Sequence, residues 1–330
     1  MKQGRLVSIG LVFFVLAGGA GLWQPAPVAG AETYPNRPVT VIVGWAAGGQ
    51  TDIVVRLLSK IAEKELGVPI LVDNKPGGGA TLGPATLARS KPDGYTIGAL
   101  SLAQMGVIPL FQKVPYDTFK EFDFICGFGR YLYGVYARTD SPFKSIKDVV
   151  EAARKNPGKI SFGAMSPPIS LGLKYVEAKE NIKMTYIPFQ SGQECAMALV
   201  GGHTHLSIGT PDSVIQFIEK KEVTPLAVIS EERWSFFPNV PTMKEQGYDL
   251  DITGGMIMGA PAGTPKDRME VVYKAFQKAH SDPEAKATLE KLWLYAPYRT
   301  GAQVRESLVR DANKWKPFIE AMNLKTPPKK

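Results

Sequence analysis

Residue types that build catalytic and metal sites are scarce in this chain. Only two cysteines, Cys126 and Cys195, and three histidines occur among its 330 residues. His203 and His205 alternate at the start of a predicted strand, which gives half a zinc site at most, and no third ligand at helical spacing accompanies them. The cysteines either form one disulfide or, as their separate settings favour, are two small buried side chains. We therefore expect neither a metal site nor a thiol nucleophile.

Familiar enzyme and nucleotide-binding motifs are also missing. There is no G-x-S-x-G elbow, no S-x-x-K beside the glycine-rich loops, and neither glycine motif of the phosphate-binding loops. The formal net charge is +8, but the basic residues are scattered among acids and form no block. This pattern argues against a nucleic-acid surface. We expect no cofactor, and Asp52 remains the one candidate for a general base.

One long apolar run occurs, and it lies at the N-terminus. Two basic residues precede an apolar stretch over residues 6–22, and Ala29-Gly30-Ala31 has the A-x-A form of a cleavage site. A membrane anchor is the competing interpretation, but the glycines within the stretch and the cleavage site favour removal. We predict that residues 1–31 are a signal peptide and that an exported mature chain begins near Glu32.

The first strand–turn–helix pattern of the mature chain contains the first candidate site for an anion. Residues 39–43 are apolar and rich in β-branched side chains, a glycine-containing turn follows at 44–49, and residues 53–61 have helical apolar spacing. Such a turn points backbone N–H groups at one place beside the positive end of a helix, which suits a phosphate or a carboxylate. The alternative is a plain tight connection with Thr51 or Asp52 as N-cap.

A second glycine loop strengthens the interpretation as a site. Residues 70–74 read as the next strand and the loop at 75–83 follows it. Adjacent parallel strands place both loops at the same carboxyl edge, where α/β folds bind ligands. A third strand ends at Ser101, whose hydroxyl either reaches a ligand or caps a helix. Trp45 either stacks on a ligand or packs under its loop.

The remaining chain repeats the α/β pattern. The segment 122–138 crosses into a second series of strands and helices, and a strand over 251–260 returns. Two such series joined by crossing segments indicate two lobes with a cleft between them, whose second wall the turns at 163–166, 189–192 and 209–212 would line. We predict a first lobe from residues 32–132 and 250–330 and a second lobe from 133–249. Expected helix starts are Ser145 as a capping residue, about Ser170, Gly192, Pro211, and Thr264 as N-cap before Pro265.

An ordered set of short motifs resembles a known family. The motifs are Tyr34-Pro35-Asn36-Arg37-Pro38, Asn74-Lys75-Pro76-Gly77-Gly78-Gly79, Lys91-Pro92-Asp93-Gly94-Tyr95-Thr96, Pro188-Phe189-Gln190-Ser191-Gly192, Gly201-Gly202 and Phe237 to Gly247. In this order they resemble the Bug (TctC-like) periplasmic solute receptors of tripartite tricarboxylate transporters. The resemblance implies a type II, Venus-flytrap periplasmic binding fold. It also implies a monomer that captures a small carboxylate for the transporter's membrane components.

The resemblance also implies a binding site. In the family a carboxylate is held chiefly by backbone N–H groups, hydroxyls and ordered waters, and not by an arginine clamp. Matched by motif, the near wall comprises Trp45, Gly48, Gly49, Gln50, Thr51, Asp52, Gly77, Gly78, Gly79, Ala80, Thr81 and Ser101. The far wall comprises Ser166, Phe189, Ser191 and Thr210. Closure is expected to bend the crossing segments near Arg130 and Gly254.

Several residues depart from the family pattern. Trp45 stands where Phe or Tyr is usual, Ala47 replaces Pro, and Ser170 replaces a frequent His. His205 and Gly209 take places where acids are common. The loss of acids from the far wall weakens the case for an amine-bearing ligand. We therefore expect a plain mono- or dicarboxylate, aliphatic or aromatic.

Two other functions stay open at this point. One is an exported enzyme acting on a carboxylate with Asp52 as base. The other is a sensor module that presents its closed form to a signalling receptor instead of a transporter.

Overall fold

A computed structural model describes residues 33–78, 80–250, 252 and 254–322. The expected signal peptide (1–31), the expected start at Glu32, Gly79 and the end of the chain lie outside the described residues. Within the described ranges, no helix is both long and apolar enough to cross a membrane.

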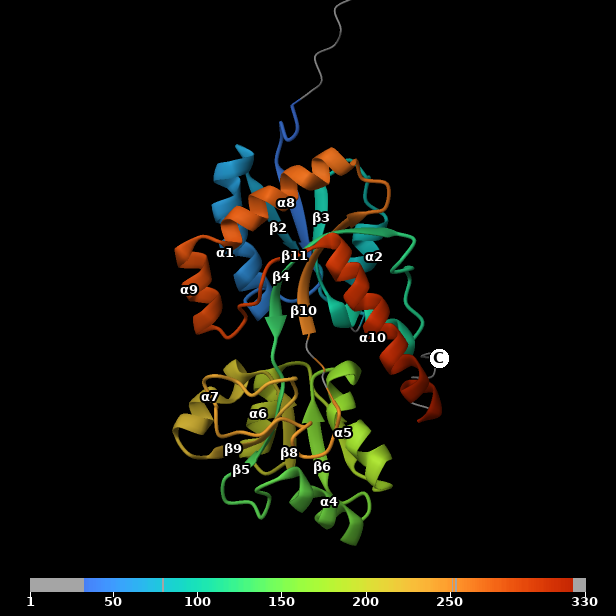
Figure 1. The fold of residues 1–330 in the computed structure, drawn as a ribbon, viewed down its shortest axis with the longest axis vertical. Coiled ribbons are helices and arrows are strands. Elements are labelled where there is room, and N and C mark those ends of the chain that lie inside the picture. The colour runs from blue at the N-terminus through green and yellow to red at the C-terminus, as the bar shows by residue number, and fades with distance from the viewer. Residues whose placement is uncertain (1–32, 79, 251, 253, 323–330) are drawn as a thin grey trace, which may run out of the picture. The chain divides into compact units, whose positions relative to one another are not determined.

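The first lobe is built on a mixed sheet of strand order β11-β4-β10-β3-β1-β2 (Figure 1). Strand β1 pairs in parallel with β2 and β3, whereas β10 pairs antiparallel with β3 and β4. The strands are β1 (Val39–Val43), β2 (Ile70–Asn74), β3 (Thr96–Ser101), β4 (Phe122–Tyr131), β10 (Gly254–Pro261) and β11 (Arg299–Thr300). Strand β1 is nearly all apolar because both faces of the sheet are covered.

Helices cover the two faces of this sheet. Helix α1 packs against α8 and α9 (Figure 1). Helix α10 packs against η1 and α3. A buried cluster that includes Leu87, Leu100, Met105 and Leu308 fills the space under α2, η1 and α10. The helices are α1 (Gln50–Leu66), α2 (Leu82–Ala88), the π-helix η1 (Ala103–Val107), α3 (Ile108–Phe111), α8 (Lys266–His280), α9 (Pro283–Lys291) and α10 (Gly301–Ala321).

The second lobe has a sheet of order β7-β6-β8-β5-β9, which repeats the pattern of β2-β1-β3-β10-β4 in the first. Strand β6 is parallel to β7 and β8, and β5 is antiparallel to β8 and β9. The elements are β5 (Gly134–Arg138), α4 (Ile146–Lys155), β6 (Ser161–Ala164), α5 (Pro167–Glu180), β7 (Thr185–Pro188), α6 (Gly192–Val200), β8 (Leu206–Gly209), α7 (Pro211–Glu219) and β9 (Val223–Val228). The predicted α/β class with two lobes is confirmed.

Some helix starts differ from the sequence prediction. Ser145 caps α4 as predicted, because its hydroxyl accepts from the N–H of Asp148 at 3.2 Å. Helix α5 begins at Pro167, three residues before Ser170, since proline suits a first turn whose N–H groups have no helical partner. The N-cap of α8 is Pro265. Thr264 donates instead to the carbonyl of Pro261 at 2.7 Å.

The two cysteines are free and buried, Cys126 in β4 of the first lobe and Cys195 in α6 of the second. The interpretation as two separate buried side chains is confirmed. His205 Nδ1 lies 3.1 Å from the backbone nitrogen of Ser161, from which it accepts a hydrogen bond. The described residues contain no cluster of three potential metal ligands.

Candidate ligand-binding site

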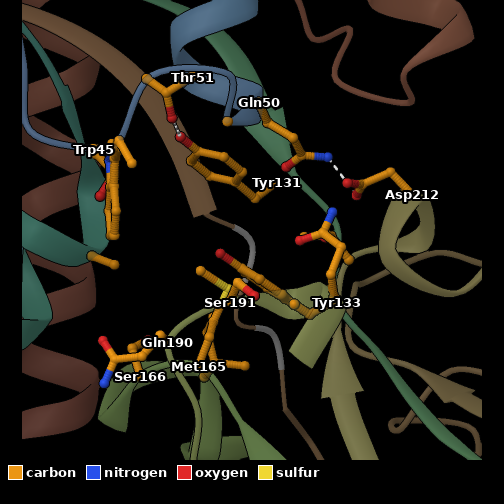
Figure 2. Close-up of a pocket in the computed structure, with 18 of the residues that line it drawn as sticks. Trp45, Gln50, Thr51, Tyr131, Tyr133, Met165, Ser166, Gln190, Ser191 and Asp212 are labelled. Carbon is orange, nitrogen blue, oxygen red and sulfur yellow. Dashed lines mark hydrogen bonds between the residues drawn. The ribbon is translucent and has the colours of Figure 1, made fainter. Parts of the chain in front are cut away.

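A cavity of about 510 Å³ is lined by residues of both lobes (Figure 2). This volume is typical of sites for small organic ligands. The lining residues are Trp45 to Thr51, Ile53, Ser101, Ala103, Ile108, Tyr131, Tyr133, Met165, Ser166, Pro168, Ile169, Gln190 to Gln193, Thr210, Asp212 and Leu292.

Four helix N-termini meet at this cavity. They are the starts of α1, α5, α6 and α7, whose N-cap residues are Gly49, Ser166, Ser191 and Thr210. Each helix start carries N–H groups without helical partners and the positive end of a helix dipole. None of the described lining residues is a lysine, arginine or histidine. The wall therefore favours an anion through peptide dipoles and hydroxyls, not through basic side chains.

The start of α1 is shaped by glycine. Gly49 is the N-cap in an extended conformation without a side-chain cap, which corrects the expectation of Thr51 or Asp52 in that role. Gly48 has a φ of 80°, which favours glycine because it has no Cβ. Among described residues, no acceptor pairs with the backbone N–H groups of Gln50 and Thr51. These two amides remain available to a ligand.

Asp52 stabilises the first glycine loop through hydrogen bonds and does not line the cavity. Its carboxylate accepts from the Gly48 N–H at 2.9 Å, from Arg56 Nε at 3.0 Å and from Asn74 Nδ2 at 2.9 Å. Burial acts to raise the pKa of Asp52, but hydrogen bonds from Arg56, Gly48 and Asn74 prevail and lower it. The carboxylate is thus a weak base whose partners fix the first glycine loop.

Two tyrosines that sequence reasoning did not single out line the cavity. Tyr131 ends β4, and its hydroxyl lies 2.5 Å from the Thr51 hydroxyl (Figure 2). Burial raises the pKa of Tyr131 to about 12, so the phenol stays neutral. Tyr133 stacks on Tyr131 with ring centroids 6.4 Å apart. The aromatic enrichment of 122–138 was the only signal in the sequence.

The Thr51–Tyr131 pair is expected to be energetically coupled. Both residues are buried, so Tyr131→Phe or Thr51→Val alone leaves a hydroxyl with no partner from the pair. The double variant removes both hydroxyls and should lose less unfolding free energy than the sum of the single losses, by about 1 kcal/mol. Urea denaturation of the four proteins measures this coupling. Additive losses would show that the contact stabilises nothing.

A contact across the cavity joins the two lobes. The Gln50 side chain at the start of α1 donates from Nε2 to Oδ1 of Asp212 in α7 at 2.5 Å (Figure 2). Burial raises the pKa of Asp212. His205 and Gly209 led us to expect a far wall without acids. That expectation is wrong, because Asp212 lines the cavity there. This acid is the last residue of the turn at 209–212 that was expected to line the second wall.

The structure gathers many of the expected site residues in the lining. These are Trp45, Gly48, Gly49, Gln50, Thr51, Ser101, Ser166, Ser191 and Thr210. Ser101 accepts from the Gln104 N–H at 3.1 Å while lining the cavity. The Trp45 indole N–H is buried without a hydrogen-bond partner in the described part of the chain. Both interpretations of these two residues stay open.

Other expected site residues lie outside the lining. They are Asp52, Gly77, Gly78, Ala80, Thr81 and Phe189, and Gly79 lies outside the described residues. The second glycine loop has local reasons for its composition. Gly77 and Gly78 have φ values of 129° and 61°, and the Thr81 hydroxyl donates to the Gly78 carbonyl at 2.8 Å. Contact of this loop with a ligand stays a prediction.

Comparisons with known proteins place the chain in a family. The sequence model of the "Tripartite tricarboxylate transporter family receptor" (TctC) matches residues 54–324. The chain is 31% identical over 306 residues to the "UPF0065 protein in gbd 5'region" of Cupriavidus necator, covering 92% of this chain and 93% of the relative. It is 28% identical over 269 residues to "Protein BugT" of Bordetella pertussis, covering 80% and 81%.

Solved structures show the same fold. "Structure of periplasmic binding protein BugD" superposes with a TM-score of 0.77 at 27% identity, over 89% of this chain and 100% of the other. "Structure of a periplasmic transporter" superposes with a TM-score of 0.79 at 27% identity, over 88% and 99%. The two lobes thus have the fold of periplasmic binding proteins. The chain belongs to the TctC, or Bug, family of tripartite tricarboxylate transporter receptors.

Proposed function

We propose that the protein is a periplasmic solute receptor that captures a small carboxylate and delivers it to the membrane components of a tripartite tricarboxylate transporter. The observation that carries the proposal is the meeting of four helix N-termini at one cavity without a basic side chain in its described lining. Family membership supports the transporter as partner. We further propose export through residues 1–31, a monomer, lobe boundaries near 132 and 250, and bending near Arg130 and Gly254.

The chemistry of the wall suits a carboxylate attached to a carbon skeleton. A carboxylate that leaves water needs several donors to replace its lost hydrogen bonds. The amides of Gln50 and Thr51 and the hydroxyl of Ser166 can supply them. The apolar side chains of Ile108 and Ile169 line the same cavity and suit an aliphatic or aromatic body. We accordingly propose a mono- or dicarboxylic acid.

Catalysis is the weaker alternative. Asp52, the one candidate base, lies outside the cavity lining, and its hydrogen bonds lower its pKa. No histidine lines the described cavity wall to activate Ser166 or Ser191 as a nucleophile. Relatives in the family are described as receptors, which favours binding without turnover.

A thermal-shift screen of the chain from Glu32 tests the proposal. Aliphatic and aromatic mono-, di- and tricarboxylates are compared with their methyl esters, which keep the skeleton and lose the charge. An acid at about a hundred times its dissociation constant should add about 2.7 kcal/mol of stability, and its ester should add little. Recovery of the acid unchanged after incubation checks for turnover. Equal shifts from esters, or none from any acid, would refute the carboxylate receptor.

A further inference from the structure

The charge on the cavity wall has an unexpected sign. Asp212, the second residue of α7, is the one charged residue among the described lining residues. One carboxylate oxygen accepts from Gln50 at 2.5 Å, and within the described chain no lysine, arginine or histidine forms a salt bridge with Asp212. Neighbouring Tyr133 and Tyr136 are neutral phenols, because burial raises the pKa of each and keeps it protonated. The Thr210 hydroxyl and the backbone N–H groups of Asp212 and Ser213 also interact with this carboxylate. Its partners in the described chain are thus neutral donors, and no protein cation balances its charge.

This carboxylate discriminates between ligands by charge. A second ligand carboxylate near Asp212 would meet a like charge inside a partly desolvated cavity, where Coulomb repulsion is much stronger than in water. An ammonium group would meet an opposite charge and could donate up to three hydrogen bonds. It would also relieve the cost of a half-buried carboxylate that lacks a cationic partner.

Asp212 lies close to the amides that begin α1, which limits the separation between the ammonium and the carboxylate of such a ligand. Gln50 offers its backbone N–H at the start of α1, and its side chain reaches Asp212. Gln50 thus contributes one of the amides that favour an anion and also contacts the acid Asp212. A ligand that uses both would carry its negative and positive groups a few bonds apart.

We propose that Asp212 selects a carboxylate that also carries a protonated amine, with the ammonium on Asp212 and the carboxylate at the amides that begin α1. This inference rests on the proposed function and narrows its ligand class to small amino acids. It replaces the expectation of a plain acid, which relied on an acid-free far wall.

Isothermal titration of the chain from Glu32 with matched acid pairs tests the inference. The pairs are glutamate against glutarate, phenylalanine against phenylpropionate, and γ-aminobutyrate against butyrate. In at least one pair the amino compound should bind about tenfold more tightly or better, which corresponds to about 1.4 kcal/mol. Asp212→Asn keeps the size of the side chain and should abolish this preference. Asp140→Asn, an exposed acid of the second lobe outside the cavity, is the matched control and should preserve it.

The outcomes separate the inference from the proposed function. Plain acids that bind as tightly as their amino partners in the unmodified protein would overturn the inference and leave the carboxylate receptor standing. Equal weakening of both members of a pair in Asp212→Asn would reduce Asp212 to a structural role and also overturn it. Binding by no acid of either kind would remove the proposed function and the inference together. The unmodified protein alone gives the first comparison, so the test does not depend on folding of the variant.

Discussion

Replacing Gly301 with alanine is expected to lower the free energy of unfolding by more than about 3 kcal/mol. Gly301 is the first residue of α10, and a Cβ there would overlap the Phe124 carbonyl oxygen and lie 2.7 Å from its carbonyl carbon. Both atoms belong to the backbone of β4, which is held between β10 and β11. The strand cannot give way without loss of ladder hydrogen bonds. Urea denaturation monitored by circular dichroism measures the loss.

Gly263→Ala is the matched control for this prediction. Gly263 has a φ of 85°, but a Cβ added there would meet no atom within 4 Å beyond its immediate chain neighbours. Its substitution should therefore cost only the left-handed backbone strain, about 1 to 2 kcal/mol. A Gly301 variant no less stable than the Gly263 variant would mean that α10 and β4 adjust freely, contrary to the close packing of these two elements.

Asp52→Asn is expected to destabilise the protein by about 2 to 4 kcal/mol at neutral pH. The Asp52 side chain is 4% exposed and accepts from the Gly48 N–H, Arg56 and Asn74. Asparagine has a similar shape, but it removes the negative charge and turns one acceptor into a donor facing these donors. The first glycine loop should loosen, and ligand affinity should fall with it.

The pH dependence of stability identifies the charge as the cause. Since the pKa of Asp52 is lower in the folded protein, its contribution is present above the unfolded pKa, near 4. That contribution disappears as the pH falls through the lower folded pKa. The difference in stability between the unmodified protein and Asp52→Asn should therefore shrink in acid.

Asp73→Asn provides the comparison for Asp52. This acid pairs with Lys75, and both side chains are more than two-fifths exposed, so its loss should cost less than about 1 kcal/mol. A constant difference between Asp52→Asn and the unmodified protein across the acid range would show that steric change, not charge, destabilises the variant.

Local patterns explain which parts of the fold were predictable. The β-branched run of β1, the glycine turn after it and the helical spacing of α1 are all encoded within a few residues. The Ser145 cap and the start of α6 at Gly192 are similarly local. Strand order could not be predicted in this way, because no local pattern in residues 254–261 indicates that this strand inserts between β3 and β4. The π-helix η1 after Ser101 also has no local signature and was not predicted.

The candidate site likewise contains residues that local patterns predict and residues that only the tertiary structure brings in. Ser166, Ser191 and Thr210 line the cavity because strand–turn–helix patterns place N-cap residues at the carboxyl ends of parallel strands. Asp212 lines the cavity as part of the predicted turn at 209–212, but its contact with Gln50 of the other lobe has no signal in residue spacing. Tyr131 joins the site because β4 ends beside the start of α1, which residue spacing does not encode either. The glycines at 77 and 78 have a local explanation in their positive φ values.

The insertion of β10 has a consequence for how the protein folds. Strand β10 lies between β3 and β4 in the first sheet, yet it begins at Gly254, after every strand of the second sheet has passed. The second sheet uses strands from the continuous stretch Gly134 to Val228, so its contacts close shorter loops and cost less chain entropy. In the first sheet, β3 and β4 can pair with β10 only across the long chain segment that forms the second lobe. We therefore expect the first lobe to finish folding after the second.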